Sequence, residues 1–181
     1  GSPTWLYLSD RLIQFPLGLF GVAIALVALP DLTEQFINQN KREFKKVFLK
    51  GFLSTFILGL LSGLFYVMLS YQIIQLLFFR GEFTNYDVEM TSLSLVAYSY
   101  ALPFILSSKF FTSVFFAASK TKFVLILGCT SLFINLVLNY LFIFTYDWGH
   151  VGLALATTFA AIFVWLLAII FIFRINSNKV S

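Results

Sequence analysis

Charged and reactive side chains are scarce in this sequence. Only 11% of its 181 residues are charged, whereas 60% are hydrophobic, and a soluble domain usually carries about 25% charged residues. The single cysteine, Cys129, excludes an intrachain disulfide and a cysteine metal cluster, and the single histidine, His150, is interpreted as a loop residue. The sequence also lacks a glycine-rich phosphate loop, an HExxH pair and a Ser/His/Asp set. We therefore predict that the chain is not an enzyme and holds no metal.

Apolar residues instead gather in five stretches, each at least 20 residues long, at 11–30, 47–69, 92–118, 123–145 and 151–173. A helix needs about 20 residues to cross ~30 Å of hydrocarbon. One soluble core could not bury five such stretches, so we predict an all-α membrane protein with five transmembrane helices. Pro30 is expected to end the first span, and 31–46 to form an interfacial amphipathic segment.

Positive charges lie in alternate loops. They occur between the first two spans, after the third span and in the tail: Lys41, Arg42, Lys45, Lys46, Lys120, Lys122, Arg174 and Lys179. Because cytoplasmic loops of membrane proteins are rich in Lys and Arg, we expect the N-terminus outside and the C-terminus in the cytoplasm. The net charge of +4 then suits a membrane surface, and we expect no nucleic-acid partner.

The pair Asp10-Arg11 opens the first span, where charge is costly. Both side chains could extend to the interface. Alternatively, Arg11 could face a water-filled cavity and hold an anion, because its planar guanidinium binds phosphate or carboxylate through two hydrogen bonds. We expect Pro16, with Gly18 and Gly21, to loosen the helix one turn later, as occurs near transporter substrate sites.

Other polar residues interrupt the later spans. Lys109, in the third span, either extends to the cytoplasmic face or lines a cavity open to it. Asn135 and Asn139 share one face of the fourth span, and Thr157 lies in the fifth. These three residues either form hydrogen bonds between helices or line a cation site with oxygens. The GxxxG at 59–63 predicts close helix packing.

Three motifs carry a family resemblance. They are WLYLSDRLIQFPLGLFGVA at 5–23, LFFRGEFTNYD at 77–87 and GHVGLALAT at 149–157. In this order and spacing they resemble the MurJ (MviN) family of lipid II flippases, which belongs to the MATE-like multidrug/oligosaccharidyl-lipid/polysaccharide (MOP) exporter superfamily. The resemblance extends over nearly the whole chain.

The resemblance implies a fold and a function. Residues 1–181 would be part of the C-terminal lobe, the eighth to twelfth helices of such a flippase, so the N-terminal lobe and the seventh helix are missing. The full protein would move lipid II, an undecaprenyl-pyrophosphate-linked disaccharide-peptide, across the bacterial plasma (inner) membrane by alternating access. Its partners would be lipid II, the bilayer and the N-terminal lobe. The alternatives are a related MATE-like exporter of drugs or polysaccharide-linked lipids, and a non-transporting helical membrane scaffold.

The resemblance also assigns roles to residues. Arg11 would meet the pyrophosphate of lipid II, with Asp10 beside it, and Lys109 matches a recurrent lysine of the tenth helix. Asn135, Asn139 and Thr157 fall where some relatives bind sodium. Asn139 stands where those relatives have Asp, and a further Asp would come from the missing seventh helix. A sodium site is therefore doubtful, and we expect no cofactor.

Overall fold

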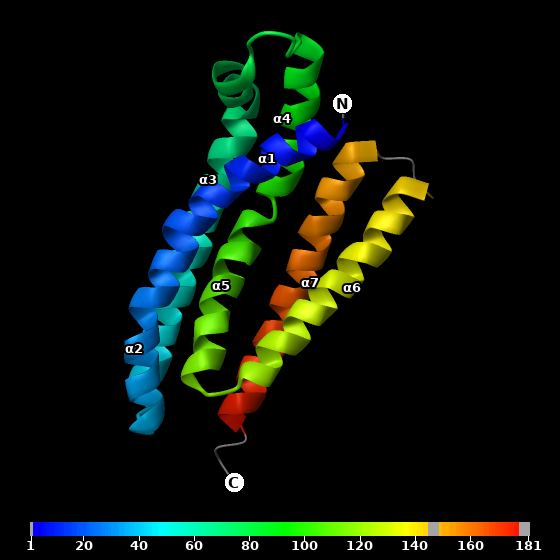
Figure 1. The fold of residues 1–181 in the computed structure, drawn as a ribbon. Helices are drawn as coiled ribbons and strands as arrows, with labels where there is room; N and C mark the ends of the chain where they lie inside the picture. The colour runs from blue at the N-terminus through cyan, green and yellow to red at the C-terminus, as the bar shows by residue number, and fades with distance from the viewer. Residues whose placement is uncertain (1, 145–148, 178–181) are drawn as a thin grey trace.

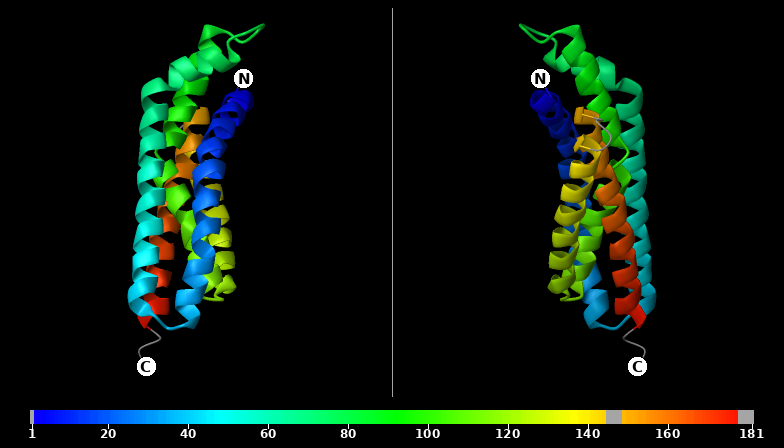
Figure 2. Two further views of the ribbon diagram at one scale, coloured as in Figure 1. Left: turned by 90° about the vertical axis from the view of Figure 1, so that its left-hand side faces the viewer. Right: turned by 90° about the vertical axis from the view of Figure 1, so that its right-hand side faces the viewer.

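The computed structural model describes residues 2–144 and 149–177, which form an elongated bundle of helices (Figure 1). In chain order these are α1 (Ser2–Pro16), the π-helix η1 (Leu17–Val22), α2 (Ala23–Ile37), α3 (Lys41–Phe78), α4 (Asn85–Ser99), α5 (Leu102–Ala117), α6 (Thr121–Phe144) and α7 (Gly149–Ser177). The all-α prediction is confirmed. The α2–α3 and α5–α6 turns lie at the same end as the last turn of α7, here called the basic end. The start of α1, the α3–α4 loop and the start of α7 lie at the other, the N-terminal end (Figures 1 and 2).

The described helices supply as many as five membrane spans. Four are long and apolar enough to cross a bilayer by themselves: Pro3–Ile37, Lys41–Phe78, Thr121–Ile143 and Gly149–Arg174. The pair α4 and α5 makes a fifth candidate, bent by 47° at its break. The chain is therefore a multi-pass membrane protein, and its five apolar stretches correspond to these five units.

The predicted end of the first span is wrong. Pro30 lies inside α2, which continues to Ile37. Proline removes one backbone donor, but membrane helices tolerate this where neighbouring groups adjust. Residues 31–46 do not form a separate element either, because 31–37 end α2 and 41–46 begin α3; their place at the membrane interface stays a prediction. The chain reverses between them at 38–40, where Gln39 takes a φ of 53°.

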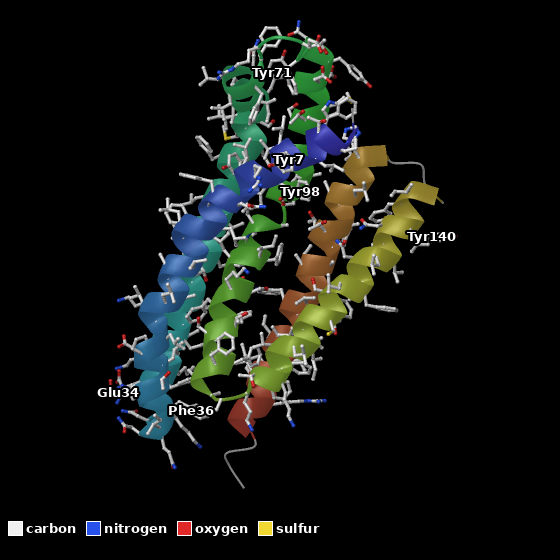
Figure 3. All side chains as sticks on the ribbon, in the orientation of Figure 1. Tyr7, Glu34, Phe36, Tyr71, Tyr98 and Tyr140 are labelled. Carbon is white, nitrogen blue, oxygen red and sulfur yellow. The ribbon has the colours of Figure 1, made fainter. Side chains whose placement is uncertain are left out.

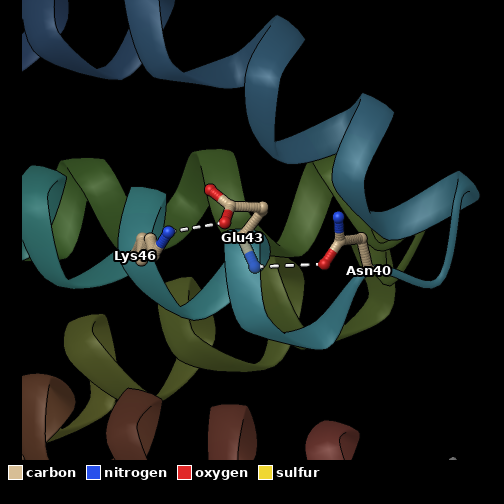
Figure 4. A network of polar contacts seen from close by, with 3 residues as sticks. All are labelled: Asn40, Glu43 and Lys46. Carbon is tan, nitrogen blue, oxygen red and sulfur yellow. Dashed lines mark hydrogen bonds and ion pairs between the residues drawn. The ribbon is translucent and has the colours of Figure 1, made fainter.

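A polar cap starts α3 at the basic end (Figure 4). The Asn40 side-chain oxygen accepts a hydrogen bond from the Glu43 backbone N–H at 3.2 Å, and Glu43 pairs with Lys46 at 2.6 Å. Asparagine at the N-cap and an acid in the first turn both stabilise a helix start. The helix then runs for 38 residues, so it extends beyond the predicted 47–69 at both ends.

The third predicted span, 92–118, is not one helix. The chain forms α4 and α5 with a break at Tyr100-Ala101, just before Pro103. The helix α4 also begins earlier than predicted, because Thr84 and Asp87 form a capping box at its start. The last two predicted spans correspond to α6 and α7, although residue 145 and Lys179 lie outside the described residues.

Aromatic rings fill the core toward the basic end (Figure 3). The Phe111 ring is nearly parallel to those of Phe48 and Phe52, with centroids 6.0 and 5.6 Å away. The Trp165 ring of α7 meets Phe52 and Phe104 in the same layer. The helix α5 is thereby enclosed by α2, α3 and α7, whereas α6 packs chiefly on α7 and remains largely exposed.

Candidate functional site

Arg11 lies well inside a helix rather than at its start, because α1 begins at Ser2. The Arg11 side chain is exposed, and its Cζ atom lies 4.9 Å from the centroid of the Tyr7 ring, one turn earlier. This distance permits a cation–π contact. Within 2–144 and 149–177, Arg11 has no ion-pair partner. Its guanidinium is thus oriented by an aromatic ring and remains available to an anion.

Asp10 is turned away from Arg11. Adjacent helix positions point about 100° apart, and the half-buried Asp10 carboxylate accepts a hydrogen bond from the Gln14 amide at 2.5 Å. The neighbouring charges therefore occupy different sides of α1, and Asp10 does not neutralise Arg11 through direct contact.

The predicted loosening of the first span is confirmed. The π-helix η1 follows Pro16 directly and includes Gly18 and Gly21. Pro16 has no N–H to offer to the Leu12 carbonyl four residues back. The Tyr66 hydroxyl of α3 donates to that carbonyl instead, at 2.7 Å. A side chain of a neighbouring helix thus satisfies the acceptor that proline leaves open.

Lys109 lies beside this irregular turn. Its side chain is exposed, and a Cβ built on the buried Gly21 would come 3.8 Å from the Lys109 Cβ. Gly21 follows Arg11 by ten residues in a continuous helical segment, which corresponds to about 15 Å. The structure therefore brings Lys109 to the helix that carries Arg11, but the two cations are not in contact.

The second predicted cluster is assembled between α6 and α7. The Asn135 amide donates to the Thr157 hydroxyl at 3.1 Å, and the Asn139 amide donates to the Asn135 carbonyl oxygen at 2.9 Å. The interhelical hydrogen bond is therefore present. The buried side-chain oxygen of Asn139 has no hydrogen-bond partner. All three residues are neutral, and the described residues hold no group of three His, Cys, Asp or Glu that could bind a metal, so the cluster itself brings no charge to balance a cation.

Three further residues at this site were not predicted from sequence. Tyr98 of α4 (Figure 3) lies close enough to Asp10 and to Thr157 to interact electrostatically with both, so it lies between the two clusters. A run of hydroxyl residues in the apolar stretch, TSLSLVAYSY at 91–100, could have indicated it. Tyr7 and Gln14 could have been found from their helical spacing of four residues to Arg11 and Asp10.

An aromatic clamp closes the N-terminal end of the bundle. The buried Trp5 donates its indole N–H to Asp87 at 2.8 Å and meets the His150 ring edge-on at 4.9 Å. Ser9 donates to the Thr91 carbonyl at 2.9 Å. The prediction that His150 is a loop residue is therefore wrong. His150 lies half-buried in the first turn of α7. These contacts hold α1 against α4 and α7.

The fold and its sequence have clear relatives. The family model described as lipid II flippase MurJ matches residues 1–178. A protein of Vibrio cholerae named "Probable lipid II flippase MurJ" is 40% identical over 161 residues, which cover 89% of this chain and 30% of that protein. A Haemophilus influenzae protein of the same name is 34% identical, with 89% of this chain and 32% of that protein covered.

A solved structure gives the same assignment. The structure titled "Lipid II flippase MurJ, inward closed conformation" superposes with a TM-score of 0.84 at 27% identity, and the match covers 95% of this chain and 36% of that one. The chain thus spans about a third of the length of its relatives. With a family model matched over almost every residue, the chain belongs to the MurJ family of lipid II flippases.

Proposed function

We propose that the full-length protein containing this chain moves lipid II across the bacterial plasma membrane by alternating access. Family membership supports this function, and the observation that carries it at residue level is the exposed Arg11 guanidinium, stacked on Tyr7 and unpaired with Asp10. The chain is one part of the C-terminal lobe. The N-terminal lobe of the same protein supplies the opposite wall of the cavity.

In this proposal Arg11 binds the pyrophosphate of lipid II. A planar cation that stays charged at all physiological pH values suits a diphosphate. Asp10 and Gln14 hold one another beside it. Lys109 of α5 packs beside Gly21, which lies about 15 Å from Arg11 along its helix, and meets the anionic headgroup as it passes. No bond of the lipid is broken, because transport needs only a change in which side of the membrane the cavity faces.

Asn135, Asn139 and Thr157 serve chiefly to hold α6 against α7 in this proposal. Their amide and hydroxyl groups hydrogen-bond with each other, and such membrane contacts contribute roughly 1 kcal/mol or less each. We accordingly propose transport without a cofactor at this cluster.

The proposed orientation puts the basic end of the bundle in the cytoplasm. The cations Lys41, Arg42, Lys45, Lys46, Lys120, Lys122 and Arg174 support it, since all lie near that end. In a Cys129→Ala background of the full-length protein, a cysteine at Asn40 should react only from the cytoplasm and one at Asn85 only from outside. Labelling of position 40 from outside would contradict the proposed orientation.

The central test replaces Arg11 in the full-length protein. Loss of one charge-assisted phosphate contact costs about 1.5–3 kcal/mol, or roughly ten- to a hundredfold in affinity. We expect Arg11→Ala to abolish lipid II flipping in proteoliposomes and complementation of a flippase-depleted strain. Arg11→Lys should keep partial activity, because it retains the charge without the planar fork.

Arg80 offers a matched control. It is an exposed arginine in the α3–α4 loop whose guanidinium bonds to the Leu77 carbonyl of its own segment. Arg80→Ala should leave flipping unchanged at equal expression. Wild-type flipping by Arg11→Ala would refute the assignment of the pyrophosphate to Arg11.

A further inference from the structure

The break between α4 and α5 leaves backbone carbonyls without helical donors. In an α-helix the N–H of Ala101 would bond to the carbonyl of Ala97. Here it bonds to Tyr98 at 2.9 Å, three residues back. Pro103 has no N–H for the carbonyl of Ser99. The carbonyl oxygens of Ala97 and Ser99 therefore lack their usual helical donors at a bend of 47°.

Thr158 of α7 supplies a donor to one of them. Its hydroxyl lies 2.9 Å from the Ala97 carbonyl oxygen and 3.1 Å from the carbonyl of Ala154 in its own helix. The Thr158 side chain is only 4% exposed, so water does not readily replace it. The hydroxyl can donate only one hydrogen. The Ala97 carbonyl of α4 and the Ala154 carbonyl of α7 therefore compete for it.

Two glycines of α3 close the opposite side of the break. A Cβ on Gly59 would lie 2.4 Å from the Pro103 Cα, and a Cβ on Gly63 would lie 2.8 Å from the Ser99 carbonyl oxygen. The predicted close packing of the GxxxG is thus confirmed, and its partner is the α4–α5 break. With α3 against one side and Thr158 bonded on the other, the bend is held from two directions.

The bend decides where Lys109 lies. Lys109 follows Ala101 by eight residues, which is about 12 Å along α5. If α5 continued the axis of α4, a rotation of 47° would displace Lys109 by about 10 Å. Its present position against Gly21 of η1 therefore depends on the break.

We propose that Thr158 is a positioning residue that fixes the α4–α5 bend and so holds Lys109 beside the helix of Arg11. The proposal rests on the proposed function, because Lys109 matters only if it meets the lipid headgroup. Thr158 does not itself contact substrate. It acts through the Ala97 carbonyl and the direction of α5.

The test uses the full-length protein and two control variants. Thr158→Val removes the hydroxyl, and Thr158→Ser retains it. Thr55→Val is the matched control, since Thr55 is fully buried in α3 and, among the described residues, its hydroxyl bonds to Gly51 and Phe52 of its own helix. All three are compared at equal expression and equal thermal stability.

A distance measurement reports the bend itself. Spin labels at Leu93 of α4 and Phe116 of α5, both exposed, are placed in a Cys129→Ala background. Phe116 lies about 22 Å beyond the break, so each 10° of bending moves it by about 4 Å. We expect Thr158→Val to shift or broaden the distance distribution, and Thr158→Ser and Thr55→Val to match the wild-type protein. An unchanged distribution in Thr158→Val would overturn the positioning role.

Flipping assays give the second readout. We expect Thr158→Val to lose roughly tenfold in lipid II flipping, the usual scale of one buried hydrogen bond, and Thr158→Ser to restore it. A shifted distance with wild-type flipping would overturn the connection to Lys109. Arg11→Ala distinguishes failure of the proposed function from failure of the positioning role of Thr158. It tests substrate binding and should leave the distance between the labels unchanged.

Discussion

Replacing Gly59 by alanine tests how closely α3 approaches α5. The added Cβ would lie 2.4 Å from the Pro103 Cα, 2.8 Å from its nitrogen and 3.0 Å from the Leu102 carbonyl oxygen. Non-bonded carbons rest at about 3.5–4.0 Å. All three neighbours are backbone atoms, so no side chain can rotate away, and the helices must separate by more than ~1 Å.

The expected cost follows from two opposing effects. Overpacking of this kind costs about 1–3 kcal/mol, and the better helix propensity of alanine returns up to about 1 kcal/mol. We expect a net loss of about 1–2 kcal/mol in the free energy of unfolding. The measurement is the unfolding midpoint of the full-length protein in detergent micelles, followed by heat or by SDS titration.

Gly128 provides the control for this change. It lies in α6, and a Cβ built there meets nothing within 4 Å. Gly128→Ala should therefore be neutral or slightly stabilising. If Gly59→Ala unfolds at the same midpoint as Gly128→Ala, the two helices do not approach as described.

Three other changes test contacts near the site. Tyr7→Phe should retain flipping because the ring still faces Arg11. Tyr7→Ala should weaken lipid II binding severalfold, since an exposed cation–π contact contributes about 0.5–1 kcal/mol. Equal lipid II binding by both variants would contradict the contact. Tyr66→Phe should lower the free energy of unfolding by about 1 kcal/mol, because the part-buried Leu12 carbonyl would lose the donor that Tyr66 supplies, and unchanged stability would refute that bond. Asn139→Ala should destabilise the protein by about 1 kcal/mol or less and leave the ion dependence of flipping unchanged; loss of a sodium dependence would show that the cluster binds the ion.

The prolines show which part of the fold could be predicted from sequence. Apolar length located the helical spans, but Pro30 does not end the first helix, and the third span, predicted as one helix over 92–118, breaks just before Pro103. Pro30 remains inside α2, whereas the helix breaks just before Pro103. The difference comes from tertiary contacts: the break at Pro103 meets Thr158 and the glycines of α3. Such contacts join residues far apart in the chain, and a local pattern does not contain them.

The candidate site was predictable to a similar extent. Charge within an apolar stretch indicates Arg11, Asp10 and Lys109 as candidates, because ionised groups are rare in a bilayer, and their role stays a prediction. Their geometry was not predictable. Tyr98 belongs to a different helix from both Asp10 and Thr157, and its place between them follows from how α1, α4 and α7 pack.

The π-helix η1 also sets the rotational phase of the first span. Buried positions in α1 fall at Trp5, Ser9, Ile13 and Pro16, whereas those further along fall at Gly21, Ala25, Ala28 and Leu32. With a regular repeat of 3.6 residues per turn, the buried positions after η1 would each fall about one residue earlier in the sequence. The wider turn of η1 contains one extra residue, and the buried residues before and after it therefore lie on the same face of the bundle. Deleting a single residue from 17–22 would therefore rotate α2 by about 100° relative to α1. In the MurJ family, chain length within this turn should accordingly be under stronger constraint than the identity of its exposed side chains.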